Sequence, residues 1–130
     1  MQDRPTAREL LADIADLLEG DVVPVLEGPL QHQVRVAGNL CRIIERELRL
    51  GAGNDARQAQ TLADLLDAGP ADIADHAARL DERLRTGDDV DADFERRAWA
   101  TLVEIVRGKL AVTKPGHDAY DFAAEAVGPA

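Results

Sequence analysis

The sequence predicts an all-α fold, and three observations lead to this prediction. Apolar residues recur every three or four positions over long stretches of the 130-residue chain, which is the spacing of one helix face. Aromatic residues form only 3% of the chain, so a core must be built from leucine, isoleucine, valine and alanine, which suits helices better than sheets. Glycine and proline fall between the periodic stretches. We therefore expect a single domain, 1–130, folded as an irregular bundle of about five helices.

The first helix is expected to begin at a capping box formed by Thr6 and Glu9, in which each side chain accepts a hydrogen bond from the other residue's amide. Its apolar face continues to Leu18, and Gly20 is expected to end it. The segment 21–29 contains two prolines and should turn the chain.

The second helix should run from Pro29 to about Leu50 and end at the segment "GAGN", 51–54. A third helix is expected over 55–68, and a fourth from the following Gly-Pro pair to Thr86. The fourth helix has only a narrow apolar stripe, so we expect it to lie at the edge of the bundle.

The fifth helix is expected over 92–112, and Trp99 lies in the middle of its apolar arc. We therefore predict that Trp99 is buried, and that helices one, two and five supply most of the core. From about residue 117 to residue 130 the sequence is weakly patterned and predicts a partly ordered tail.

Charge and composition restrict the partners. Fifteen Lys and Arg residues against 25 Asp and Glu residues give a net charge of −10, which repels nucleic acid and anionic membrane surfaces. The single cysteine, Cys41, has no internal disulfide partner and is expected to be a small core residue. No apolar run has membrane-spanning length, and the first residues do not have a signal peptide's pattern. A cytoplasmic location, with no nucleic acid or membrane partner, is expected.

The second helix carries a row of polar residues that is the main candidate for an interaction or anion site. At about 100° per residue, four side chains fall on one side of it: Arg35, Asn39, Arg42 and Arg46. One interpretation is a solvated face that makes surface ion pairs, for example between Glu45 and Arg49. The other is a docking surface for an anionic group or an acidic partner.

Glu47 completes the candidate site, because it projects into an apolar arc that includes Val36 and Leu40. An unpaired carboxylate would be costly there. One interpretation is that Glu47 lies near the helix end and either reaches water or pairs with an arginine from another helix. We predict that Glu47 has an arginine or backbone partner. A buried general base is the alternative, although no second catalytic group lies in register with it.

Recognisable catalytic and metal-binding motifs are missing from the sequence. His32, His76 and His117 lie on three different segments, without the spacing of a carboxylate-bridged metal site. The pair Asp72 and His76 is interpreted as ordinary surface. There is no phosphate loop, nucleophile elbow or dinucleotide fingerprint. We therefore expect no metal and no cofactor, and an enzyme is less favoured than a binding protein.

Four phrases together resemble an uncharacterised bacterial family of small helical proteins, a domain of unknown function. They are "RPTARELL" at 4–11, "VLEGPL" at 25–30, "RVAGNLCRIIEREL" at 35–48 and "GKLAVTKPG" at 108–116. The resemblance implies a gene beside kinase-like proteins of the aminoglycoside phosphotransferase class and beside acyl-CoA dehydrogenases, and it assigns no catalytic residue. On the second helix the matching residues are Arg35, Val36, Ala37, Asn39, Arg46, Glu47 and Leu48, and Gly38 replaces an alanine.

The resemblance leads to the hypothesis of an accessory or interaction protein for a phosphotransferase and acyl-CoA dehydrogenase system, with one of those enzymes as its protein partner. The sequence leaves open whether the chain also forms a homodimer. The alternative function is binding of a small ligand, an anion or an acyl-CoA-related compound, or an enzyme activity, at Arg35, Asn39, Arg46 and Glu47.

Overall fold

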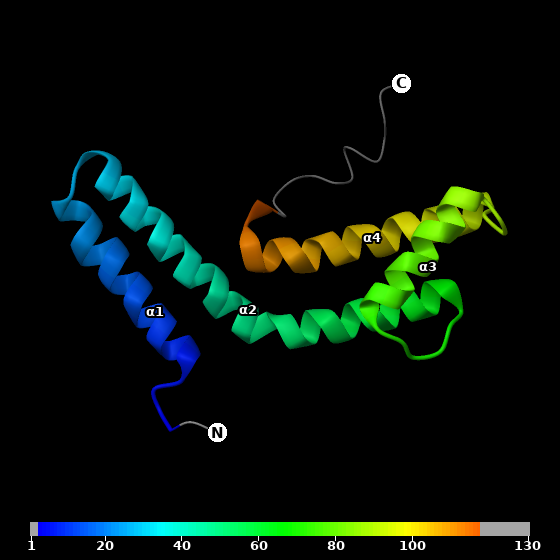
Figure 1. The fold of residues 1–130 in the computed structure, drawn as a ribbon, viewed down its shortest axis with the longest axis horizontal. Coiled ribbons are helices and arrows are strands. Elements are labelled where there is room, and N and C mark those ends of the chain that lie inside the picture. Colours follow the sequence, from blue (N-terminus) through cyan, green and yellow to red (C-terminus); the bar gives the residue numbers. More distant parts are fainter. Residues whose placement is uncertain (1–2, 118–130) are drawn as a thin grey trace. The chain divides into compact units, whose positions relative to one another are not determined.

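The computed structural model describes residues 3–117, and within this range the chain is helical without any strand. Figure 1 shows the four α-helices: α1 (Ala7–Leu17), α2 (Gly28–Leu66), α3 (Ile73–Thr86) and α4 (Ala92–Thr113). The predicted all-α class is confirmed. The predicted tail lies outside the described residues, apart from its first residue.

The chain divides into two compact units, Met1–Gly51 and Ala52–Ala130. The first, here called the hairpin unit, contains α1 and the first part of α2. The second, here called the three-helix unit, contains the rest of α2 together with α3 and α4. Helix α2 therefore supplies residues to both units.

Helix α1 begins as predicted. The hydroxyl of Thr6 accepts a hydrogen bond from the Glu9 amide at 3.2 Å, and the Glu9 carboxylate accepts one from the Thr6 amide at 2.7 Å. The hydrogen bond from the Thr6 amide lowers the pKa of Glu9. The predicted stop at Gly20 is wrong, because the helix widens into a π turn at Leu18–Val22 that includes this glycine.

The prediction of about five helices is also wrong, because α2 continues through the "GAGN" segment as one helix of 39 residues. A glycine ends a helix when it takes a left-handed conformation with positive φ. Gly28, Gly87 and Gly116 do so, but Gly51 and Gly53 do not. Gly51 and Gly53 each lower the stability of the helix by about 1 kcal/mol relative to alanine. The continuous backbone hydrogen bonding of the 39-residue helix offsets this loss.

The largest core lies in the three-helix unit, and α3 contributes to it. Five buried side chains form one cluster: Leu62, Leu65, Leu80, Phe94 and Ala98. Leu80 belongs to α3 and is only 4% exposed, so this helix contributes to the core although most of its residues are exposed. The expectation that helices one and two supply most of the core is wrong, because the cluster comes from the end of α2, from α3 and from α4.

Trp99 is 69% exposed, so its predicted burial is wrong. Helix α4 turns Phe94, Ala98 and Ile105 toward the core cluster, at spacings of four and seven residues. Trp99 follows Ala98 directly and is turned by about 100° from it. The apolar arc of α4 is therefore wider than the surface that α2 and α3 cover.

His76 is buried rather than exposed, which corrects its interpretation as surface, whereas Asp72 is exposed as expected. Its side chain has 0% exposure, and neither ring nitrogen has a hydrogen-bond partner. Ala63 and Pro70 are among the residues that line a cavity of about 190 Å³ beside it. A buried polar group without a partner reduces the stability of the fold.

Replacing His76 with leucine should therefore stabilise the three-helix unit. We expect His76→Leu to raise the free energy of unfolding by about 1 kcal/mol, because it removes two unpaired nitrogens and keeps most of the volume. His76→Asn, which is smaller and still polar, should lower it. Urea denaturation measures both, and a His76→Leu variant less stable than the parent would show that the ring nitrogens are satisfied.

The continuity of α2 predicts the effect of alanine at Gly53. No atom lies within 4 Å of a Cβ built there, so Gly53→Ala should raise the free energy of unfolding by about 0.5–1 kcal/mol. Gly87 is the matched control, because its φ of +71° makes alanine costly by about 1 kcal/mol or more. Destabilisation by Gly53→Ala in urea denaturation would indicate a helix break near residue 53.

Candidate functional site on the hairpin unit

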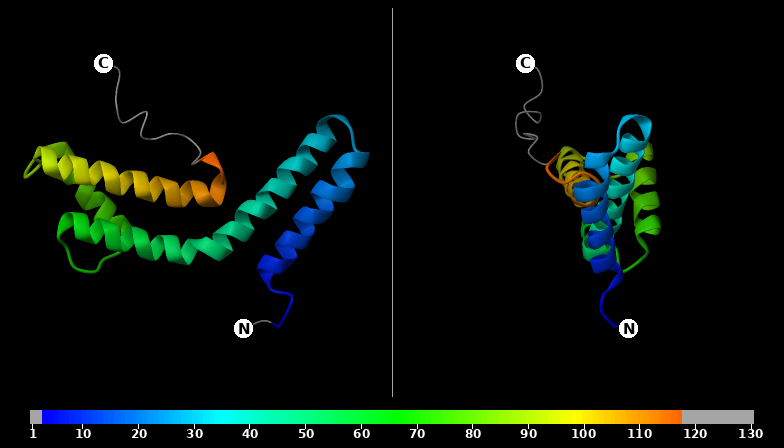
Figure 2. Two further views of the ribbon diagram at one scale, coloured as in Figure 1. Left: turned by 180° about the vertical axis from the view of Figure 1, so that it is seen from behind. Right: turned by 90° about the vertical axis from the view of Figure 1, so that its left-hand side faces the viewer.

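Helix α1 runs antiparallel beside the first part of α2, as Figures 1 and 2 show. Ala15 on α1 is completely buried, and Gly38 on α2 is buried as well. A Cβ at Gly38 would lie only 3.1 Å from Cγ of Glu19. The two small residues thus allow close approach of the chain segments.

Arg42 joins the two segments of the hairpin unit. Its Nη2 lies 3.0 Å from Oε2 of Glu19 and 2.6 Å from Oδ1 of Asp16. The two carboxylates, Glu19 first, raise the pKa of the Arg42 guanidinium. The positive charge of Arg42 is therefore balanced within the hairpin unit.

Glu45 makes a second link between the two helices. Its Oε1 lies 3.8 Å from Nε of Arg8 on α1 and 3.4 Å from Nε of Arg49 on α2. The predicted pair of Glu45 and Arg49 is confirmed. Together with Arg42, these contacts place a charged seam between α1 and α2.

The remaining members of the predicted polar row face outward to different degrees. Arg35 and Asn39 are exposed, and Arg46 is half-buried. At about 100° per residue these three side chains lie within a narrow arc of α2, and Arg42 lies at its edge toward α1. Arg35, Asn39 and Arg46 are here called the polar face.

The prediction that Glu47 has an arginine or backbone partner is wrong. Its side chain is exposed and makes no hydrogen bond or ion pair with the residues that the structure describes. The apolar arc around it is itself open, since Val36 is 43% and Leu40 is 52% exposed. The carboxylate also extends over Gly51, and its Oε1 would lie 2.7 Å from a Cβ added at this glycine. This exposed position does not match the alternative of a buried general base.

Another surface of the hairpin unit is apolar and was not singled out by the sequence. It is here called the apolar face and consists of two rows with alternating spacings of three and four residues. The row on α1 is Leu10, Ile14 and Leu17, and the row on α2 is Leu30, Val34, Ala37, Cys41, Ile44 and Leu48. The six leucines and isoleucines among these nine residues are each 45–56% exposed. Cys41 is half-buried, so its predicted place in a core is not confirmed.

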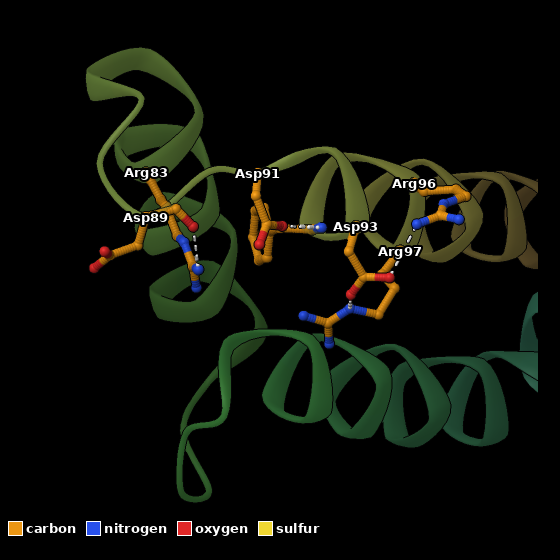
Figure 3. A network of polar contacts seen from close by, with 7 residues as sticks. Arg83, Asp89, Asp91, Asp93, Arg96 and Arg97 are labelled. Carbon is orange, nitrogen blue, oxygen red and sulfur yellow. Dashed lines mark hydrogen bonds and ion pairs between the residues drawn. The ribbon is translucent and has the colours of Figure 1, made fainter.

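The three-helix unit has a polar network around the turn between α3 and α4 (Figure 3). The guanidinium of Arg83 stacks on the Phe94 ring, with 3.7 Å between its Cζ and the ring centroid, and its Nη2 donates to the Asp89 carbonyl at 2.7 Å. Asp91 caps α4 by accepting from the Phe94 amide. Sequence analysis missed the stack of Arg83 on Phe94, because these residues lie on different helices and have no shared motif.

Among residues 3–117, no group of three or more His, Cys, Asp or Glu side chains is arranged to hold a metal ion. Within the same range, no helix combines the length and the apolar character needed to cross a membrane. Four of the cavities that described residues line have volumes of about 190–340 Å³ and lie within the three-helix unit.

Residues 24–117 match a family described as a domain of unknown function, DUF6285. The chain belongs to this family. The match includes α2, α3 and α4, so the polar face of this DUF6285 chain lies within it, whereas α1 precedes it. No curated protein and no solved structure matches the chain.

The geometry around Arg42 predicts different effects for two neighbouring arginines. Arg42→Gln should reduce the free energy of unfolding by about 1 kcal/mol or less, because both ion pairs are partly exposed. Arg35→Gln, at an exposed position without an ion pair to any described residue, should change it by less than about 0.5 kcal/mol. Urea denaturation at low salt compares them, and equal losses would contradict a special role for Arg42 between the helices.

Proposed function

We propose that this DUF6285 protein is an accessory protein that acts by binding another protein. One observation carries the proposal: the hairpin unit exposes a polar face that is built on regular helix. The arginines of this polar face provide local electrostatic contrast for an acidic partner, because the chain as a whole has a net charge of −10.

The partner that fits the resemblance is a kinase-like phosphotransferase, with an acyl-CoA dehydrogenase as the second candidate. Arg35 and Asn39 are exposed and would make the first polar contacts. Arg42 would contribute less, because Asp16 and Glu19 already balance its charge. The polar face is therefore expected to orient the partner and to increase the association rate rather than to supply most of the affinity.

Charge reversal at Arg35 tests this role. Association of the purified chain with the kinase-like neighbour should weaken as ionic strength rises. Arg35→Glu should lower the association rate, by roughly tenfold or less at low salt, with little change in the dissociation rate. Surface plasmon resonance measures both rates.

Arg57→Glu provides the matched control, since Arg57 is an exposed arginine on the same helix but belongs to the three-helix unit. This variant should bind like the parent. No association at low salt would contradict the proposed function. Equal loss of association rate in the two variants would show that net charge, rather than the polar face, determines the encounter.

A further inference from the structure

We propose that the apolar face of the hairpin unit binds a second copy of this chain, so that two hairpin units form a four-helix bundle. This inference concerns a different surface from the polar face and does not depend on the identity of any other partner. It follows from the positions of the two apolar rows, from the incomplete core of the hairpin unit and from its charge.

The two rows lie on the same side of the hairpin unit. Buried Ala15 marks the side of α1 that faces α2, and the contacts of Gly38, Arg42 and Glu45 mark the side of α2 that faces α1. Successive side chains are turned by about 100° about the helix axis. On each helix, the apolar row therefore lies roughly 90–130° away from the side that contacts the other helix. The direction of this rotation is the same on both helices. Because the helices are antiparallel (Figure 2), the same rotational sense brings both rows to one side.

The hairpin unit lacks a closed core of its own. Among the large aliphatic side chains described in it, only Val23 is buried, at 8% exposure, while Leu17, Leu30 and Leu48 are each more than half exposed. A pair of helices buries only one narrow stripe of side chains on each helix. A four-helix bundle encloses side chains from all four helices in a common core. The spacing of three and four residues on both rows is the spacing that packs one helix against another in such bundles.

A second copy fits this face because an antiparallel hairpin is complementary to itself. In a twofold arrangement the same patch serves on both subunits, so each apolar row meets an apolar row. The row on α2 extends over 19 residues from Leu30 to Leu48, about 27 Å at the helical rise, and the row on α1 extends over about 10 Å. At a helix width of about 10–12 Å, the two rows give a projected footprint of roughly 400 Å², within a factor of about two of the roughly 800 Å² per partner of a stable interface.

Charge opposes this pairing only weakly. Residues 1–51 contain six arginines and nine acidic residues, a formal charge of −3, so that −7 of the total of −10 belongs to residues 52–130. No charged residue belongs to either row. The row on α2 also stops at the boundary of the unit, because the next positions in its spacing are Gly51 and Asp55. The apolar face is thus a property of the hairpin unit alone.

Sedimentation equilibrium of the full chain at micromolar concentrations tests the inference. The parent should have about twice the monomer mass of 14.1 kDa. Leu30→Glu and Leu48→Glu place a charge at the two ends of the α2 row and should give monomers. Val36→Glu is the matched control, because Val36 is 43% exposed on the same helix but lies outside the row, and this variant should remain dimeric.

Cys41 supplies a second readout, since it lies within the row on α2. In the dimer its thiol should react slowly with a maleimide, and Leu48→Glu should accelerate the reaction while circular dichroism shows unchanged helix content. A monomeric parent overturns the proposal. If the Cys41 thiol of that monomer is protected, the chain covers its own apolar face. If the thiol is reactive, the apolar face is free. Dissociation by Val36→Glu to the same extent as by Leu48→Glu would overturn it as well.

Discussion

The continuity of α2 is the constraint on which the rest of the structure depends. The helix runs through Gly51 and Gly53 without a left-handed residue, and its two parts serve different units. Its first part holds the charged seam with α1 through Arg42 and Glu45. Its last turns place Leu62 and Leu65 in the core of the three-helix unit. A break near residue 53 would separate the helix that carries the polar and apolar faces from the helix that organises the core.

The two units bury their apolar side chains to different extents. The three-helix unit encloses Leu62, Phe94 and Leu80, and the Arg83 guanidinium covers the Phe94 ring. In the hairpin unit, small residues and ion pairs contribute to the contact between the two helices, and regular apolar rows stay exposed. A core that closes within the chain gives stability, whereas an amphipathic hairpin gives a surface for association. The functional proposals therefore concern the hairpin unit.

Much of the helical pattern could be predicted from the sequence, because it depends on local signals. The capping box of Thr6 and Glu9 marks the start of α1. Helix α4 begins at the predicted residue 92, after the cap provided by Asp91, and ends one residue beyond the predicted Val112. The end of α3 at Thr86 was predicted too, and it is followed by a glycine with positive φ.

The remaining features depend on tertiary context that periodicity does not contain. The φ angle of Gly51 is not visible in the sequence, so a glycine inside a helix resembles a glycine that ends one. Trp99 is exposed and His76 is buried, the reverse of what was expected. Burial depends on which arc of α3 and α4 packs against another helix. Glu47 lies in an arc that is apolar but open, so its carboxylate stays exposed. For the candidate site, spacing placed Arg35 and Asn39 near each other on α2, but the ion pairs of Arg42 with α1 and with the following turn required the folded hairpin.

The measurement that tests the central claim most directly is residue-resolved NMR of the segment 51–54 in the full chain. A continuous α2 predicts helical carbon chemical shifts at Gly51, Ala52, Gly53 and Asn54, and amide exchange slower than in an unstructured peptide. Coil-like shifts with rapid exchange at these four residues, between helical neighbours on both sides, would contradict it and would restore two separate helices at this point of the chain.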